Sequence, residues 1–178
     1  THLFPILNRL GIYAHTDLIL LTKVLRVIKA CFAESIERKD AELFLQEEVE
    51  KIFQFVIMPS ISLIDPGNPA LLQEAWGVLE LMPYQARYRM YAFWKNKSEQ
   101  LHPDVLVAQK TATMETRYFM KRLSKENVKK YGRVLGKLSH SNPGAVFDKI
   151  LTTIQEDGYN NLVDPVVERP QHVLKVEP

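Results

Sequence analysis

The sequence has very little cysteine, and this scarcity excludes several kinds of site. With Cys31 alone, an intrachain disulfide and a cysteine-based zinc site are both ruled out. No apolar run reaches the roughly 18 residues that a membrane span needs, because Lys23, Arg26 and Lys29 interrupt the longest one. Cys31 lies in the apolar helical stripe "VLRVIKACFAESI", so we expect a buried, unreactive thiol.

The sequence has no initiating methionine and no obvious end of a fold at its C-terminus, so we expect a fragment of a longer polypeptide. The 178 residues are 46% hydrophobic and 25% charged, a composition typical of globular proteins that bury a sizeable core. We therefore expect residues 1–178 to form a single helical segment of a larger protein.

The residues that usually perform catalysis or bind metals are scattered. No two of the five histidines have the spacing of metal ligands, so neither a metal nor another cofactor is expected. Glu47, Glu48 and Glu50 indicate a solvated helix face instead of a catalytic carboxylate pair. The sequence therefore does not indicate an enzyme or a small-molecule substrate.

Apolar residues recur at helical spacing through most of the chain, and no segment alternates convincingly as a strand. The pattern predicts a helix over 17–36 with Asp17 as its N-cap. It predicts a second helix that Asp40 caps and Pro59 ends. Three further helices are expected to begin at Pro69 (capped by Asn68), at Pro83 and at Pro143 after Asn142. Two short helices are expected to meet near residues 111–113, and Ser124 is the predicted N-cap of the helix that follows them.

This pattern predicts an all-α protein of about seven or eight helices with short connections. An antiparallel bundle or a helical-repeat array (an α-solenoid) fits it. Because no fixed sequence period is present, the array would be degenerate, of the HEAT kind or like the middle domain of translation factor 4G.

The stretch "GRVLGKLSHSNPG", residues 132–144, resembles a phosphate-binding loop but fails on spacing. Three residues separate Gly132 from Gly136, where four are needed, and Leu138 instead of Ser or Thr follows Lys137. Because the two glycines share a helix face, we expect them to permit close helix packing. The adjacent serines and His140 would not face one another on a helix, so catalysis is not expected, and His140 suits a helix C-terminus.

Charge is unevenly distributed along the chain. Residues 84–137 carry 13 Lys/Arg against 4 Asp/Glu, a net charge of +9 that leaves −7 for the rest. One helix combines a narrow apolar stripe with an opposite basic face, for which RNA or an acidic protein surface would be a suitable partner. The residues of this face are Lys125, Lys129, Lys130, Arg133 and Lys137.

Aromatic and basic residues alternate in "YQARYRMYAFWKNK", which begins at Tyr84. Arg87, Arg89 and Lys95 could contact phosphates while neighbouring tyrosines stack on bases. Aromatic residues at helical spacing are, however, more often packed in a core or between helices, with arginine stacked on them. Both interpretations remain open from the sequence.

Three segments together resemble the large second subunit of the THO complex: "MPYQARYRMYAFWKN", "YFMKRLSKENVKKYGRVLGKLSHSNPGAVFDKIL" and "NNLVDPVV". That family shows the same order of a "PYQ-RYR" segment, "MKRL-KENV", "GR-GKLSHSNP" and "NL--PVV". The resemblance covers residues 56–167 well. The tail 168–178 departs from the longer helix that the family has there.

The resemblance implies a non-catalytic helical scaffold in the nucleus. Its family binds the other THO subunits and a DEAD-box RNA-dependent ATPase, and it couples transcription and mRNA processing to mRNA export. Direct RNA binding through the basic region 84–137 is the alternative, and a segment that only spans between functional parts is a third hypothesis. No membrane partner is expected.

Overall fold

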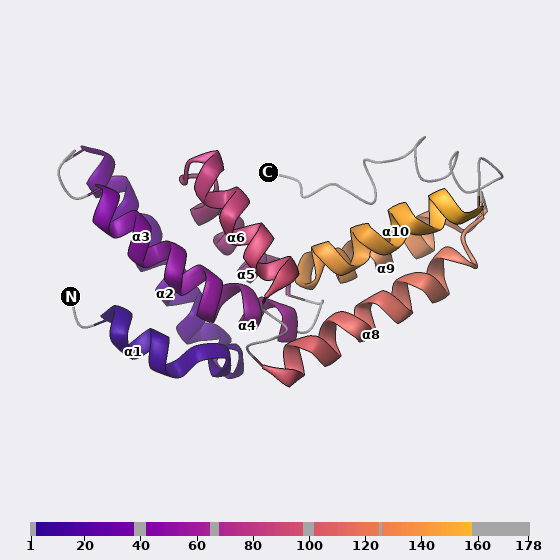
Figure 1. Cartoon of the computed structure of the whole chain (residues 1–178), viewed down its shortest axis with the longest axis horizontal. Helices are drawn as coiled ribbons and strands as arrows, with labels where there is room; N and C mark the ends of the chain where they lie inside the picture. The colour runs from indigo at the N-terminus through magenta and orange to yellow at the C-terminus, as the bar shows by residue number, and fades with distance from the viewer. Residues whose placement is uncertain (1–2, 38–41, 65–67, 98–101, 125, 158–178) are drawn as a thin grey trace. The chain divides into compact units, whose positions relative to one another are not determined.

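The computed structural model describes residues 3–37, 42–64, 68–97, 102–124 and 126–157 (Figure 1). All the secondary structure in these ranges is helical, which confirms the predicted all-α fold and is consistent with a helical array. None of the helices in them is long and apolar enough to cross a membrane. The chain divides into two compact units, Thr1–Leu106 and Val107–Pro178, and the boundary falls inside one helix.

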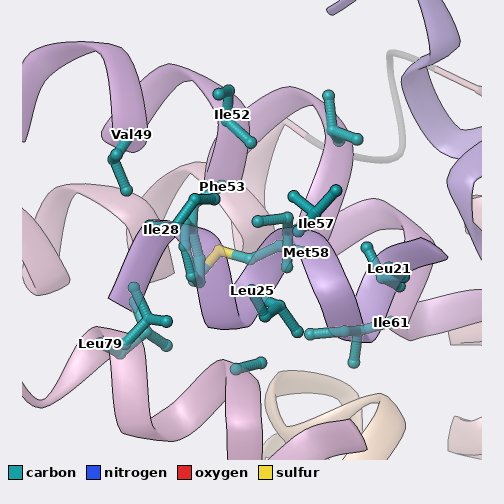
Figure 2. Packing of buried hydrophobic residues seen from close by; sticks show 14 of the residues in the cluster. Leu21, Leu25, Ile28, Val49, Ile52, Phe53, Ile57, Met58, Ile61 and Leu79 are labelled. Carbon is teal, nitrogen blue, oxygen red and sulfur yellow. The ribbon is translucent and has the colours of Figure 1, made fainter. Parts of the chain in front are cut away.

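The first unit packs its helices around one apolar core. In chain order it contains α1 (Leu3–Leu10), the 3-10 helix η1 (Gly11–Thr16), α2 (Leu18–Glu37), α3 (Glu42–Ile52), the π-helical turn η2 (Phe53–Ile57), α4 (Met58–Leu63), α5 (Pro69–Leu79) and α6 (Tyr84–Asn96). The helix α2 packs against α3 and α5. In Figure 2, Leu25 and Ile28 of α2 lie beside Phe53 and Met58.

The helix α2 begins where its cap predicts. The Asp17 carboxylate accepts hydrogen bonds from the amides of Ile19 and Leu20 at 3.0 and 2.9 Å, which confirms it as the N-cap. Leu21, Leu25, Ile28 and Phe32 are buried, as the spacing predicts.

The prediction of a buried Cys31 is wrong, because this free thiol is exposed. Cys31 immediately precedes Phe32, and consecutive residues on a helix are about 100° apart. Phe32 belongs to the buried stripe of α2, so Cys31 is turned toward the outer face of the same helix. The apolar neighbours in the sequence therefore did not imply burial.

The prediction that Pro59 ends a helix is also wrong, since α4 continues through it to Leu63. The five residues before α4 form a π turn, in which the amide of Met58 donates to the carbonyl of Phe53. Pro59 thereby lies in the first turn of a new α-helical segment, where proline's missing amide is tolerated. Asp40, the predicted cap of α3, lies outside the described residues.

The helix α5 begins at its predicted residue, Pro69, and α6 begins one residue after the predicted Pro83. Asn68 caps α5 through a hydrogen bond from the amide of Leu71 to its side-chain oxygen at 3.4 Å, and Pro69 is the first helical residue. Pro83 directly precedes α6, and the amides of Ala86 and Arg87 donate to its carbonyl.

The second unit is built on a smaller core. The helix α8 (Pro103–Met120) crosses into it at Val107 and is followed by α9 (Val128–Ser141) and α10 (Pro143–Asp157), which pack against each other. Gly132 is buried on α9, as expected for a glycine at a packed face, and α10 begins at Pro143 as predicted. The buried apolar residues of this core are Ala112, Met120, Leu135, Leu138, Val146 and Ile150.

The two short helices predicted to meet near 111–113 are instead one continuous helix, α8. Within a helix, a threonine hydroxyl can bond the carbonyl of the preceding turn, so the hydroxyl is satisfied without a break in the backbone. The hydroxyl of Thr113 donates to the carbonyl of Gln109 at 2.9 Å, and that of Thr116 donates to Ala112 at 2.7 Å. The helix thus accommodates these residues without a break.

The N-cap of α9 is Asn127, not Ser124. The Asn127 side chain caps no amide of its own helix but spans the turn before it. Its oxygen accepts from the amide of Ser124 at 2.7 Å, and its nitrogen donates to the carbonyl of Arg122 at 2.8 Å. Ser124 therefore belongs to the turn that Asn127 holds.

Candidate functional site

The basic side chains of α9 face outward. Lys129, Lys130, Arg133 and Lys137 are all exposed, whereas Leu135 and Leu138 on the other side are buried in the second unit's core. Lys125 lies outside the described residues. Four like charges along one helix form a surface that would attract an acidic partner. We call these four residues the α9 basic face.

Aromatic rings lie next to part of this charge. The Lys130 ammonium lies 5.6 Å from the centre of the Tyr131 ring, and the Phe119 ring of α8 lies 5.6 Å from that of Tyr131. Lys130 is thereby close enough for a cation–π interaction with Tyr131. Leu135 and Leu138 pack α9 into the core and so hold the α9 basic face in place.

The end of α9 shows why "SHS" is structural. Ser139 and Ser141 are buried, and the Ser139 hydroxyl donates to the carbonyl of Gly136 at 2.8 Å. This hydrogen bond directs the hydroxyl to the helix backbone. Burial lowers the pKa of His140, because desolvation disfavours the charged imidazolium.

The second predicted group of basic residues lies on α6, and one of its members is already paired. Arg89 donates through its Nη2 to one oxygen of Glu50 on α3 at 2.5 Å and through its Nε to the other at 3.2 Å. The hydrogen bond and the charge of Glu50 raise the pKa of Arg89. Glu50 is buried, so the prediction that it belongs to a solvated helix face is wrong. Its pairing with Arg89 ties α6 to α3.

The other two predicted basic residues of α6 differ in exposure. Arg87 is half-buried, and its Nε, enclosed within the described part of the chain, has no hydrogen-bond partner there. Lys95 is exposed. The predicted set therefore provides less accessible charge on α6 than on α9.

The aromatic residues of α6 divide between surface and core. Tyr84 and Tyr88 are 70% and 74% exposed, whereas Trp94 is buried and donates from Nε1 to the Ser62 hydroxyl at 2.9 Å. Tyr91 is partly exposed; desolvation is the main cause of its raised pKa. Trp94 is thus packed in the core, as one of the two interpretations predicts, whereas base stacking by Tyr84 and Tyr88 stays a prediction.

The candidate residues fall in two different units of the chain. The residues on α6 belong to the first unit and those on α9 to the second. In the ranges that the structure describes, no three His, Cys, Asp or Glu residues gather where they could hold a metal ion. The α9 basic face is therefore the strongest single candidate surface.

Sequence reasoning missed a row of exposed apolar residues on α8. Val107, Met114 and Tyr118 are more than half exposed. Their spacing of seven and four residues is a helical signal, but it resembles that of a buried stripe. Only the structure shows that the row faces solvent.

Comparison with known proteins identifies related sequences across almost the whole chain. The family model described as "THO complex subunit 2 N-terminus" matches residues 3–133. The human protein named THO complex subunit 2 is 41% identical over 175 residues, which cover 94% of this chain and 11% of the human protein. The mouse protein of the same name shows the same identity and coverage.

A plant relative is also similar. The Arabidopsis thaliana protein named THO complex subunit 2 is 33% identical over 189 residues, covering 98% of this chain and 10% of its own length. The chain thus spans about a tenth of the length of these relatives.

Proposed function

Because this chain belongs to the THO complex subunit 2 family, we propose that it is a non-catalytic, nuclear segment of a helical scaffold. The scaffold would bind other THO subunits and a DEAD-box RNA-dependent ATPase, and so couple transcription and mRNA processing to mRNA export. The observation that carries the proposal is the α9 basic face, held outward by a packed core.

The mechanism is geometric. Packed helices hold Lys129, Arg133 and Lys137 at fixed spacing, so an acidic protein surface can pair with them at little cost in ordering the scaffold. A scaffold activates an enzyme only by binding one of its states more tightly than another. The basic face would therefore favour one arrangement of the ATPase or of a neighbouring subunit.

Direct RNA binding is the second candidate, and the exposure of Tyr84 and Tyr88 favours it. Exposed tyrosines can stack on bases of single-stranded RNA. The pairing of Arg89 with Glu50 weighs against it, because this arginine is less available to a phosphate.

A charge-reversal variant tests the proposal. We expect Lys129→Glu, Lys130→Glu and Arg133→Glu together to reduce ATPase stimulation and subunit co-purification at least about tenfold, because three attractive contacts become repulsive. RNA affinity, measured over a series of salt concentrations, should stay unchanged. The same change in net charge on exposed residues of the first unit, through Arg9→Glu, Lys23→Glu and Lys97→Glu, is the matched control for ATPase stimulation.

Two results would contradict the proposal. If the α9 variant loses RNA affinity and the salt dependence becomes shallower, while assembly is kept, the face binds phosphates. If assembly fails only when a core residue such as Leu135 is truncated, the segment is a spacer between functional parts.

A further inference from the structure

The helix α8 exposes an apolar row on the side opposite its core. Val107, Met114 and Tyr118 are 61%, 65% and 51% exposed. Ala112 and Met120, from the other side of α8, are buried in the second unit's core. Apolar side chains that face solvent together along one packed helix are typical of an interaction surface.

A basic row runs beside the apolar one. Lys110, Arg117 and Lys121 are exposed, and each follows a member of the apolar row by three residues. Residues three apart are neighbours on a helix, so the two rows are parallel. The acidic residues of α8, Asp104 and Glu115, are not members of either row.

The end of the apolar row is already ordered. The guanidinium of Arg122 lies 3.5 Å from the centre of the Tyr118 ring, and its Nη1 donates to the Tyr118 carbonyl at 3.4 Å. The Tyr118 ring also packs edge-on against Phe119 at 5.3 Å. Because these contacts restrict the tyrosine and the arginine before binding, a partner has less side-chain entropy to remove.

We propose that this surface of α8 docks an amphipathic helix of a partner protein, with aliphatic residues on its contact face and Asp or Glu along one flank. The aliphatic residues would cover Val107, Met114 and Tyr118, while the acidic flank would pair with the basic row. From residue 107 to 121 the surface is about 21 Å long, so it matches a helix of about 15 residues. This docking surface does not use the α9 basic face.

Other occupants fit the surface less well. RNA would meet the basic row but gains little from the exposed side chains of Val107 and Met114, since bases stack on aromatic rings. A second copy paired through the same surface would bring the two basic rows together. An anionic membrane would contact both flanks of the apolar row, yet the basic residues lie along one flank only.

The test measures fluorescence anisotropy of a labelled 18-residue helical peptide, with leucine on one face and glutamate on one flank, added to the full 178-residue chain. We expect the same peptide with lysine in place of glutamate, and a scrambled peptide, to bind at least about tenfold more weakly. Polyuridine RNA of 20 nucleotides and phosphatidylserine vesicles are tested as competitors, and neither should displace the peptide.

Paired variants separate the apolar from the charged contribution. Met114→Gln keeps helix propensity but removes an apolar contact, so binding should weaken about fivefold. Leu151→Gln, on α10 and 59% exposed, is its control and should change binding less than about twofold. Lys110→Glu, Arg117→Glu and Lys121→Glu together should abolish peptide binding, whereas the α9 triple variant should leave it within about threefold.

Several outcomes would overturn the proposal. The first is that the peptide does not bind to the chain. The second is that the α8 and α9 triple variants lose peptide affinity equally. The third is that RNA or vesicles displace the peptide. Sedimentation that shows a dimer abolished by Met114→Gln would assign the surface to a second copy. A failure of the α9 variant in ATPase stimulation leaves this peptide assay unaffected, so the two proposals fail separately.

Discussion

Three polar side chains link distant helices in the first unit, whereas three buried hydroxyls of the second unit bond within their own helix. In the first unit Arg89 pairs with Glu50, Trp94 donates to Ser62, and the Ser60 hydroxyl donates to the carbonyl of Ile12 at 3.0 Å. These partners are 32 to 48 residues apart. Their interactions specify how the helices are arranged.

In the second unit the buried hydroxyls of Thr116, Ser139 and Thr153 each bond a carbonyl three or four residues earlier. These three bonds satisfy a polar group without selecting a neighbouring helix. The apolar contacts of the second core help to position α9 and α10. The second unit also carries the exposed basic and apolar rows. Cross-helix hydrogen bonds therefore help to specify the first unit, whereas the second unit carries the two surfaces that we propose to bind partners.

The largest expected difference between the units is in core truncation. Phe53→Ala should destabilise the first unit by about 4 kcal/mol, and Leu135→Ala should destabilise the second by about 2.5 kcal/mol, because Phe53 fills more of a larger core. Amide hydrogen exchange resolved by helix measures each effect in its own unit. Cys31→Ser, exposed on α2, is the control and should stay within about 0.5 kcal/mol. An equal loss of stability in the two units would contradict the expected difference between their cores.

A smaller effect is expected at the two side chains that order a helix start. Asp17→Ala removes a cap that accepts two amides and should cost about 1 kcal/mol. Asn127→Ala removes both bonds across the turn before α9 and should cost about 1.5 kcal/mol. Urea unfolding monitored by circular dichroism measures both. Asn68→Ala, whose cap bond is long at 3.4 Å, should cost less than either, and a larger loss there would contradict this ranking.

The smallest effect is a pH dependence in the second unit. Burial lowers the pKa of His140, so the unfolded chain, with an ordinary imidazole pKa of about 6.5, takes up a proton more readily than the folded chain. This contribution to stability is present above about pH 6.5 and is lost as the pH falls through the lower folded pKa. In the His140→Gln variant, the free energy of unfolding measured in urea should therefore fall less between about pH 7.5 and 5.

His15→Gln, in the first unit, is the matched removal of an imidazole. If the loss of stability on acidification persists in His140→Gln but disappears in His15→Gln, the pH dependence belongs to the first unit instead.

Much of the local structure could be predicted from the sequence. The starts of α2, α5 and α10, the caps Asp17 and Asn68, the buried stripe of α2 and the outward basic face of α9 all follow from spacing and from short-range hydrogen bonding. These features depend on residues within about two helical turns of one another, so the sequence contains both partners of each interaction in one window.

Tertiary structure decided which of the remaining side chains are accessible. Arg89 and Tyr88 are adjacent in sequence, yet Arg89 pairs with Glu50, 39 residues away, while Tyr88 faces solvent. Cys31 is exposed although it lies in a segment with apolar neighbours. The spacing along a helix determines which residues share a face, but whether another helix covers that face depends on residues far away in the chain.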